Sequence, residues 1–454
     1  MEIKPKLSVT GYRAIWGTDL DEQIAFEYSR AYSKYCKSKG AQKILVGRDA
    51  RQSGPIILSS VTKAFLAEDI QVEYAGILPT PTMLLLVKKL NFDAGVMITA
   101  SHNPIEYNGI KFIVHGGRLT SAEETKAIQE FYDNLTIDEK IIQGRTLDEP
   151  VIDSTSMRKI HIDEILKNID SELIRSKNFK VALDPINSGG SLITQELLQE
   201  LNCEVQVING EMTGLFAHRP EPLPENLTET AEFVKSSGVG IGFVQDPDAD
   251  RLIVINEKGE IIGEEKTLVL AIKNVLAKEP GDIVINLSTS SMSEEVAKEF
   301  GRKTYRTKIG EANVVQKILE VNAPIGGEGS SGAIYPKINT ARDSLVGIGL
   351  ILELMARENK KISEISDSLP KFFMKKEVIH FSGDLPTLYT KLKEKWNDEK
   401  INEEDGVRFD FMDSSWIHIR PSNTEPVVKI FGESKDEVRL EALFNEVHLT
   451  LNSN

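Results

Sequence analysis

The chain has 454 residues, 40% of them hydrophobic, which is enough to build three or four domains with separate cores. Its formal net charge of −15 argues against a nucleic-acid partner, because the phosphate backbone of a nucleic acid demands a basic surface. The two cysteines, Cys36 and Cys203, give neither a disulfide framework nor a metal-ligand spacing, so the sequence favours a reducing, cytoplasmic environment.

A membrane location is not expected. No apolar stretch approaches the ~20 residues of a membrane span, a run such as Met83 to Val87 being far too short, and the first residues lack the apolar core of a secretory signal. The acidic surface also repels anionic metabolites. A phosphorylated ligand would therefore have to be bound by local basic groups and backbone N–H donors in a cleft.

The first third of the chain alternates between helical and strand patterns. Residues 21–39 place apolar side chains at helical spacing, and Gly40 follows as a helix-ending glycine. The pattern then predicts strands at Lys43–Val46 and Val72–Ala75, and helices at about 56–68 and 81–89. Such alternation is typical of parallel strands joined by crossover helices.

This pattern recurs twice. The second occurrence predicts strands at 181–183 and 204–208 around a helix at 192–200, and the third predicts a strand at 282–287 with helices at 292–300 and 345–357. The mostly polar stretch from Thr136 to Ser156 is the predicted first domain boundary. We therefore expect three α/β units of similar length.

The last part of the chain differs, because its strands are neighbours in sequence. Strand patterns cover 375–381, 407–412, 416–420 and 427–433, and helical patterns cover 385–396 and 435–451. The sequence predicts a smaller α+β domain here.

Four loops carry the chemistry, and the first is Thr99-Ala100-Ser101-His102-Asn103-Pro104, followed by Asn108-Gly109-Ile110-Lys111. It comes directly after the strand pattern Ala94–Ile98, where open α/β sheets place ligand groups. A hydrolase-type Ser101–His102 pair is disfavoured, because neighbours in an extended chain point to opposite faces and no G-x-S-x-G motif occurs. Taken alone, the segment also fits an ordinary polar loop.

The second loop is Asp246-Pro247-Asp248-Ala249-Asp250-Arg251, between two apolar strand patterns. Three alternate carboxylates stay close only if a cation holds them, and oxygen ligands of this kind suit magnesium beside a phosphate. An EF-hand is the competing interpretation, since Glu257 falls at its twelfth position, but Arg251 replaces its required glycine. A solvated acidic turn is the remaining alternative.

The third and fourth loops are weaker signals. The third loop is Gly326-Gly327-Glu328-Gly329-Ser330-Ser331-Gly332, and it is not a Walker A loop. Its glycines would let the backbone approach a ligand closely, and Glu328 and Ser330 offer oxygens that can bind hydroxyl groups. Arg420-Pro421-Ser422-Asn423-Thr424-Glu425-Pro426 would form a phosphate clamp, or else a turn with local side-chain caps.

In this order and spacing, the four loops resemble the α-D-phosphohexomutase superfamily over nearly the whole chain. The resemblance implies an α/β fold of three similar α/β domains with mixed sheets plus a smaller C-terminal α+β domain around a central cleft. We expect the domains at residues 1–153, 154–256, 257–370 and 371–454, each with one of the four loops.

The resemblance also implies the roles of the site residues. Ser101 would carry the transferable phosphate, with His102 as a helper, and Lys111 and Arg13 would serve proton transfer and charge stabilisation. A magnesium ion would be bound by Asp246, Asp248, Asp250 and an oxygen of phospho-Ser101. Substrate would be bound by Arg251, Lys308, Glu328, Ser330, Arg420, Ser422, Asn423 and Thr424.

The implied reaction interconverts a hexose 1-phosphate and 6-phosphate through a sugar 1,6-bisphosphate, which would also act as the activator. Sequence variants such as Arg342-Asp343 resemble the phosphoglucosamine mutase branch, so glucosamine phosphate is the expected substrate. The alternatives are a phosphomannomutase/phosphoglucomutase of broad specificity and a non-catalytic phosphosugar-binding protein. The expected assembly is a monomer or homodimer.

Two positions depart from the family pattern. Ala14 stands where many relatives have glycine, and Gly332 stands where several place histidine. A general-base role for that histidine therefore cannot be carried over to this chain.

Overall fold

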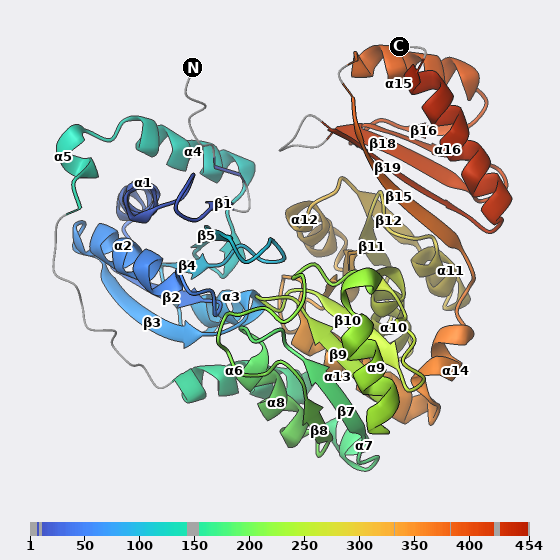
Figure 1. Cartoon of the computed structure of the whole chain (residues 1–454), viewed down its shortest axis with the longest axis horizontal. Coiled ribbons are helices and arrows are strands. Elements are labelled where there is room, and N and C mark those ends of the chain that lie inside the picture. Colours follow the sequence, from blue (N-terminus) through green and yellow to red (C-terminus); the bar gives the residue numbers. More distant parts are fainter. Residues whose placement is uncertain are drawn as a thin grey trace.

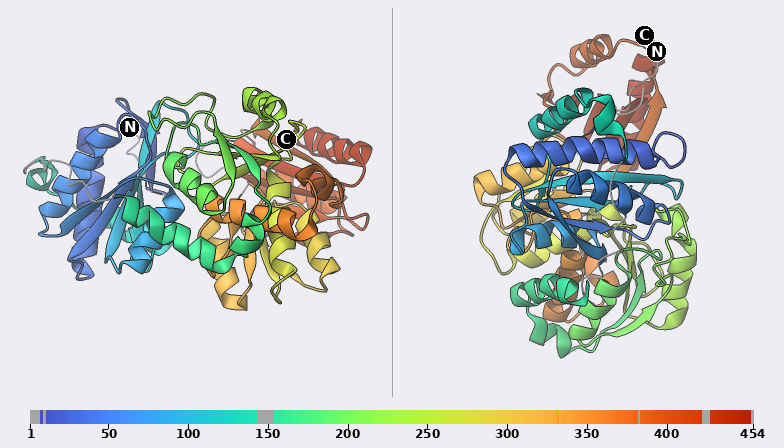
Figure 2. Two further views of the ribbon diagram at one scale, coloured as in Figure 1. Left: turned by 90° about the horizontal axis from the view of Figure 1, so that it is seen from below. Right: turned by 90° about the vertical axis from the view of Figure 1, so that its left-hand side faces the viewer.

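The computed structural model describes residues 7–8, 11–142, 154–330, 332–381, 383–421 and 427–452. Four sheets follow one another in chain order, each with its own helices, and Figure 1 shows them from the first sheet at the left to the C-terminal sheet at the upper right. Figure 2 shows the same succession along the long axis of the molecule. No helix among these residues is long and apolar enough to span a membrane.

The first sheet has the strand order β1-β5-β4-β2-β3, with β6 paired to β5. Its strands are β1 (Tyr12–Ile15), β2 (Lys43–Arg48), β3 (Gln71–Ile77), β4 (Ala94–Ile98), β5 (Tyr107–Val114) and β6 (Arg118–Leu119). Strand β2 is parallel to β3 and β4, whereas β5 is antiparallel to both β4 and β1. The helices of this unit are α1 (Glu22–Ser38), α2 (Gly54–Leu66), α3 (Thr80–Lys89), α4 (Ala122–Asp133) and α5 (Ile137–Lys140).

The second sheet has the order β10-β9-β7-β8. Its strands are β7 (Lys180–Asp184), β8 (Glu204–Val207), β9 (Ile241–Gln245) and β10 (Leu252–Asn256). Strand β7 is parallel to β8 and β9, and β10 is antiparallel to β9. Its helices are α6 (Ser154–Asn168), α7 (Ser171–Arg175), α8 (Ser191–Glu200), the short η1 (Pro224–Asn226) and α9 (Thr228–Ser237).

The third sheet repeats this plan with the order β12-β11-β13-β14. Its strands are β11 (Ile283–Asn286), β12 (Thr304–Thr307), β13 (Ile325–Glu328) and β14 (Gly332–Ile334), of which β14 runs antiparallel to β13. Its helices are α10 (Glu264–Leu276), α11 (Met292–Glu299), α12 (Glu311–Val321), α13 (Ser344–Glu358) and α14 (Ile362–Asp367).

The C-terminal sheet is antiparallel throughout, with the order β15-β19-β18-β17-β16. Its strands are β15 (Phe373–His380), β16 (Lys400–Asn402), β17 (Val407–Asp410), β18 (Trp416–Pro421) and β19 (Val427–Ser434). Helices α15 (Leu385–Lys395) and α16 (Glu437–Asn452) lie side by side on one face of the sheet, where they share its apolar core (Figure 1).

The predicted fold class is confirmed: three mixed α/β sheets precede a smaller antiparallel sheet. The expectation of parallel strands holds for part of each α/β sheet, but each sheet also contains antiparallel pairing, which short connections make possible. Strands β10 and β14 run antiparallel at the edges of the second and third sheets, and β5 runs antiparallel between β1 and β4 in the first. Helix α10 was not singled out from the sequence, because its almost continuous burial leaves little polar face to reveal a period. The predicted domain boundaries remain our proposal.

The units are joined in two different ways. The second and third units share one apolar core, in which α10 and α13 take part, so burial of this core resists their separation. The C-terminal sheet has its own core and meets the third unit through buried polar contacts. Glu433 accepts hydrogen bonds from the backbone N of Ser291 at 2.8 Å and from Trp416 Nε1 at 2.7 Å, and Ser288 Oγ lies 2.8 Å from His418 Nδ1.

Candidate active site

The loop that carries Ser101 leaves the carboxyl end of β4. Ser101 is buried and has a φ of 50°, a left-handed conformation that is strained for a residue with a side chain. Its backbone N donates to Thr99 Oγ1 at 2.9 Å, which helps to hold this conformation. Its Oγ lies 3.0 Å from Asp246 Oδ2 in the second unit.

A buried arginine from another loop of the same unit holds the carbonyls around Ser101. Arg51 Nη2 donates to the carbonyl oxygens of Ser101 and Asn103, and Nη1 donates to those of Pro104 and Tyr107, each at 2.7 Å. Arg51 Nε donates to Asp49 at 3.1 Å. With all its nitrogens engaged, this guanidinium fixes the path of the loop.

His102 lies close to Ser101, with its Nδ1 3.3 Å from Ser101 Oγ. The expectation that the two side chains point apart is wrong, because Ser101 is not in an extended conformation. Arg251 Nη2 lies 3.2 Å from His102 Nε2, and since a guanidinium can only donate, Nε2 accepts and the proton of a neutral ring sits on Nδ1. Burial, with the nearby charges of Arg251 and Arg13, holds the pKa of His102 well below its ordinary value. His102 is therefore placed to donate to Ser101 Oγ rather than to take its proton.

The three predicted metal ligands come together. Asp246, Asp248 and Asp250 are all buried in the turn between β9 and β10, and one carboxylate oxygen of each lies within 4.8 Å of the other two. The flanking elements are strands, and Glu257 accepts a hydrogen bond from Ser363 Oγ at 2.5 Å instead of joining the cluster. The EF-hand alternative is therefore excluded.

One oxygen of each aspartate is anchored by a different partner. Asp246 Oδ1 accepts from the backbone N of Arg251 at 3.1 Å, and Asp248 Oδ2 accepts from Lys111 Nζ at 2.6 Å and from Thr80 Oγ1. Asp250 Oδ2 accepts from Arg342 Nη2 at 2.8 Å.

The other oxygens of the cluster suit a divalent cation. Asp248 Oδ1 and Asp250 Oδ1 are buried and have no hydrogen-bond partner in the part of the chain that the structure describes, and Asp246 Oδ2 contacts the Ser101 hydroxyl. Buried carboxylate oxygens without partners are rare unless a ligand satisfies them. An all-oxygen donor set of this kind fits magnesium beside a phosphate.

The three carboxyl groups also affect one another's protonation. Burial and the charges of Asp250 and Asp248 raise the pKa of Asp246 well above its ordinary value. Burial alone would also raise the pKa of Asp248, but Lys111, Thr80 and Arg13 hold it below its ordinary value. The cluster thus combines one carboxyl whose charge is disfavoured with one whose charge is compensated, as expected where a cation is to bind.

Arg13 and Lys111 lie diagonally on two adjacent strands, β1 and β5. Arg13 is paired with Gly109, and a Cβ at Gly109 would lie 2.9 Å from Arg13 Cγ and 2.6 Å from the carbonyl oxygen of Tyr12. The missing side chain of Gly109 therefore gives Arg13 room. Burial lowers the pKa of Arg13, although Asp248 and Asp250 act in the opposite direction. Lys111 is more enclosed than the partly buried Arg13, with 3% of its side chain exposed.

The predicted sugar loop lies between β13 and β14 in the third unit. Glu328 Oε1 accepts from Asn286 Nδ2 and from the backbone N of Gly310, both at 2.9 Å. Arg342 Nη1 lies 3.5 Å from Ser330 Oγ and 3.9 Å from Glu328 Oε2. Lys308, predicted to line the same cleft, is exposed on the segment between β12 and α12.

The predicted phosphate clamp is described in part. Arg420 lies at the end of β18, and its Nε donates to Asp405 Oδ1 at 3.1 Å. Ser422, Asn423 and Thr424 lie outside the described residues.

Three residues with direct contacts to this site were missed. They are Thr80, the first residue of α3, and Arg51 and Arg342, in loops that the sequence analysis did not treat as chemical; each acts on residues far from it in sequence. A signal existed for Thr80, which begins α3 just beyond the carboxyl end of β3 at Ile77, where ligand groups gather in open sheets. Arg342 stood in a quoted motif, but no local pattern ties it to Asp250.

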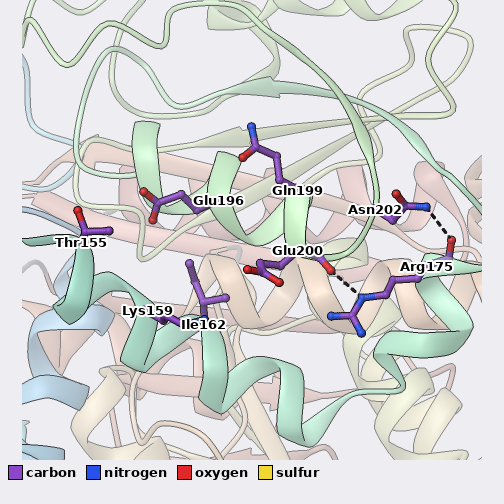
Figure 3. A pocket seen from close by; sticks show the side chains of 8 residues that line it. All are labelled: Thr155, Lys159, Ile162, Arg175, Glu196, Gln199, Glu200 and Asn202. Atoms are coloured by element: carbon purple, nitrogen blue, oxygen red, sulfur yellow. Dashed lines mark hydrogen bonds between the residues drawn. The ribbon is translucent and has the colours of Figure 1, made fainter.

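A separate cavity of about 720 Å³ lies on the second unit, away from these loops (Figure 3). It is lined by Thr155, Lys159, Ile162, Arg175, Glu196, Gln199, Glu200 and Asn202. Arg175 closes one end, where its Nε donates to the carbonyl oxygen of Glu200 at 2.7 Å. Its lining mixes positive and negative side chains and contains none of the predicted site residues.

Comparison with known protein families gives four matches in chain order. Residues 5–138, 159–259 and 264–373 match the phosphoglucomutase/phosphomannomutase alpha/beta/alpha domains I, II and III. Residues 384–449 match the C-terminal domain of the same group.

Individual relatives cover nearly the whole chain. It is 34% identical over 433 residues to a phosphoglucomutase/phosphomannomutase of Thermococcus kodakarensis, covering 94% of both chains. It is also 34% identical over 445 residues to a phosphoglucosamine/phosphogalactosamine mutase of Sulfurisphaera tokodaii, covering 96% of this chain and 97% of that one. The crystal structure of a phosphoglucomutase/phosphomannomutase family protein from Burkholderia thailandensis has the same fold, with a TM-score of 0.81 at 23% identity and 98% of both chains covered.

Proposed function

The chain belongs to the phosphoglucomutase/phosphomannomutase family and is a phosphohexomutase, and from this premise we propose that it interconverts glucosamine 6-phosphate and glucosamine 1-phosphate through phospho-Ser101. The observation that carries the proposal is the contact between Ser101 Oγ and Asp246, within a carboxylate cluster that retains two buried oxygens without a described partner. If the Ser101 hydroxyl is phosphorylated, a cation bound by the cluster can balance the negative charge of the phosphate.

In the proposed reaction, the bond between phosphorus and Ser101 Oγ breaks as a bond forms from phosphorus to the free hydroxyl of the sugar phosphate. The hydroxyl loses a proton and Ser101 Oγ gains one, and we assign this transfer to Lys111. The resulting 1,6-bisphosphate turns around, and its other phosphate returns to Ser101, so phosphate is conserved over the cycle. Magnesium, when bound by the three aspartates, would supply positive charge against the phosphoryl oxygens.

The chain's own residues then act mainly by positioning and by electrostatics. Arg51 holds the carbonyls around Ser101, and His102 donates toward Ser101 Oγ. Arg13 adds a fixed positive charge that acts on Asp248 and Asp250. We propose that Arg251, Lys308, Glu328 and Ser330 bind the sugar, and that Arg420, Ser422, Asn423 and Thr424 bind the phosphate that is not reacting.

The choice of glucosamine rests on sequence variants such as Arg342-Asp343 and on the relative from Sulfurisphaera tokodaii. The equally similar relative from Thermococcus kodakarensis favours a second candidate, a phosphomannomutase/phosphoglucomutase of broad specificity.

Phosphorus NMR distinguishes the two candidates. The protein would be given magnesium, a trace of hexose 1,6-bisphosphate and, in separate samples, glucosamine, glucose or mannose 1-phosphate. We expect the fastest conversion to the 6-phosphate for glucosamine. Faster conversion of glucose or mannose would establish the broad-specificity candidate, and absence of conversion for all three sugars would refute the proposed function.

A further inference from the structure

Arg342 touches both the metal loop and the sugar loop, although it belongs to neither. Its Nη2 donates to Asp250 Oδ2 at 2.8 Å, and its Nε donates to Glu311 Oε2 at 2.8 Å. Its Nη1 is held loosely, 3.5 Å from Ser330 Oγ and 3.9 Å from Glu328 Oε2. The three nitrogens of one planar group thus face three different segments of the chain.

The residue that follows Arg342, Asp343, is held by hydrogen bonds of its side chain and of its backbone N. Asp343 is the N-cap of α13, and its side chain accepts from the backbone N atoms of Leu345 and Val346 at 3.1 and 3.2 Å. The backbone N of Asp343 donates to the carbonyl oxygen of Ala333 on β14 at 3.1 Å. The Arg342 side chain therefore starts from a rigid position, so its direction is defined before any ligand binds.

Gly332 provides the space that Arg342 occupies. A Cβ at Gly332 would lie 2.1 Å from Arg342 Cδ and 2.4 Å from its Cγ, closer than atoms can approach. A residue with a side chain at position 332 would therefore clash with the Arg342 side chain in its observed conformation. The glycine that departs from the family pattern and the arginine ten residues later form one arrangement.

We propose that Arg342 is a positioning residue that orients Asp250 for magnesium and holds the sugar loop in register with the metal loop. The part that concerns the sugar rests on the proposed function, and the part that concerns the metal does not. A planar group that donates along fixed directions can set the angle of a carboxylate, which a single ammonium group cannot do. Partners that orient a metal ligand in this way typically account for 10- to 100-fold in metal affinity.

An effect of Arg342 through its charge and an effect through orienting Asp250 predict opposite changes in magnesium affinity when Arg342 is replaced by a neutral residue. The proposal can therefore be tested. A positive charge beside the site repels a cation, so if Arg342 acted through charge alone, its neutral replacement would bind magnesium more tightly. If it acts by orienting Asp250, both the charged replacement Arg342→Lys and the neutral replacement Arg342→Gln weaken binding.

The experiment is a calorimetric titration of the full-length chain with magnesium chloride, without sugar, in samples matched for Ser101 phosphate by intact mass. We expect a Kd for magnesium raised about 10-fold or more by Arg342→Lys and also raised by Arg342→Gln. A Kd within twofold of wild type for Arg342→Lys, or tighter binding by Arg342→Gln, would overturn the proposal.

The matched control is Arg357→Lys, which changes an arginine at the other end of α13 that contacts Glu353 at 3.1 Å. It should leave the Kd for magnesium unchanged. Glu311→Gln supplies a second test, because it disturbs Arg342 without touching Asp250. We expect a smaller loss of affinity that is not additive with Arg342→Lys, whereas full additivity would contradict action through Arg342.

A kinetic measurement then examines the sugar loop. At saturating magnesium, Arg342→Lys should raise KM for the hexose phosphate severalfold, and an unchanged KM would refute the link to Ser330 and Glu328. If the wild-type protein converted no hexose phosphate, the proposed function would fail while the magnesium titration still decided the role of Arg342.

Discussion

The carbonyl oxygen of Ser101 lies 2.7 Å from Nη2 of Arg51, a buried cation that also binds three further carbonyls of the same loop. Ser101 therefore presents its hydroxyl from a loop whose carbonyls are held by one guanidinium, while its backbone N donates to Thr99 Oγ1. Since Ser101 itself is in a strained conformation, this restraint is what keeps the hydroxyl in place.

Arg51→Lys should slow turnover by about 100-fold with little change in KM, because displacing a reacting group by about 1 Å has an effect of that size. Steady-state kinetics together with the rate of phosphate incorporation at Ser101 provide the measurement. Arg48→Lys is the control, since Arg48 at the end of β2 contacts Tyr74 at 2.8 Å and none of these carbonyls. Equal losses in both variants would show that Arg51 matters only for general stability.

Ser101→Ala should abolish conversion of hexose 1-phosphate and remove the phosphate detected on the protein, with the fold retained. The side chain that is lost makes few contacts, so the melting temperature should change little. Ser60→Ala, which removes another buried hydroxyl bonded to the backbone of Glu22, should keep full activity. Turnover near the wild-type rate in Ser101→Ala would refute the phosphoserine assignment.

Asp248→Asn should weaken magnesium binding and lower the free energy of unfolding by about 3–5 kcal/mol, because it leaves Lys111 buried without its partner carboxylate. Calorimetric titration and urea unfolding measure the two effects. Asp163→Asn, which removes an exposed partner of Lys159, should leave the free energy of unfolding nearly unchanged. An unchanged magnesium titration in Asp248→Asn would contradict its role as a ligand.

Arg420→Ala should raise KM for the hexose phosphate more than it lowers kcat, because a clamp on the non-reacting phosphate binds the ground state and the transition state alike. Initial rates over a range of substrate concentrations test this. Equal falls in kcat and kcat/KM would mean that Arg420 acts mainly in the transition state.

Acid should destabilise the junction between the third and C-terminal sheets through His418. Burial lowers the pKa of His418 to about 4, so between pH 6.5 and 4 the unfolded chain binds a proton that the folded chain does not. The free energy of unfolding should therefore fall by about 3 kcal/mol as the pH is lowered through this window. Urea unfolding at several pH values measures the slope.

His418→Gln should flatten this dependence, whereas His448→Gln, at a partly exposed histidine that pairs with Glu377, should not. Identical slopes in wild type and His418→Gln would contradict the assignment to His418.

Much of the fold could be predicted because periodicity is a local property. The strand Ala94–Ile98 was predicted with its observed bounds, and α1, α8 and α13 lie within one or two residues of their predicted ranges. The resemblance implied mixed sheets, but local patterns could not show that β5, β10 and β14 are the antiparallel strands, since strand direction and order depend on pairing between distant segments. The family resemblance, read from the four loops, is confirmed by the matches over all four domains.

The site divides in the same way. Ser101 and the three aspartates could be predicted as site residues, because they stand in short motifs whose residue types indicate a nucleophile and a metal site. The contacts that orient these residues could not be predicted, because Arg342 and Asp250 are 92 residues apart in the sequence and Lys111 and Asp248 are 137 residues apart. The contact of Ser101 with His102 was misjudged for another reason: a left-handed serine is decided by Arg51 and Thr99, not by its immediate neighbours.

The anchoring of the three aspartates by three parts of the chain has a consequence for how such a protein is made and inherited. Asp246 is held from within its own turn, Asp248 from the first unit and Asp250 from the third. During synthesis, the carboxylate cluster therefore remains incomplete until Arg342 has left the ribosome and α13 has docked. A truncated protein, or the second unit transferred alone into another protein, would lack the partners that anchor Asp248 and Asp250. Selection for the reaction therefore acts on these units together.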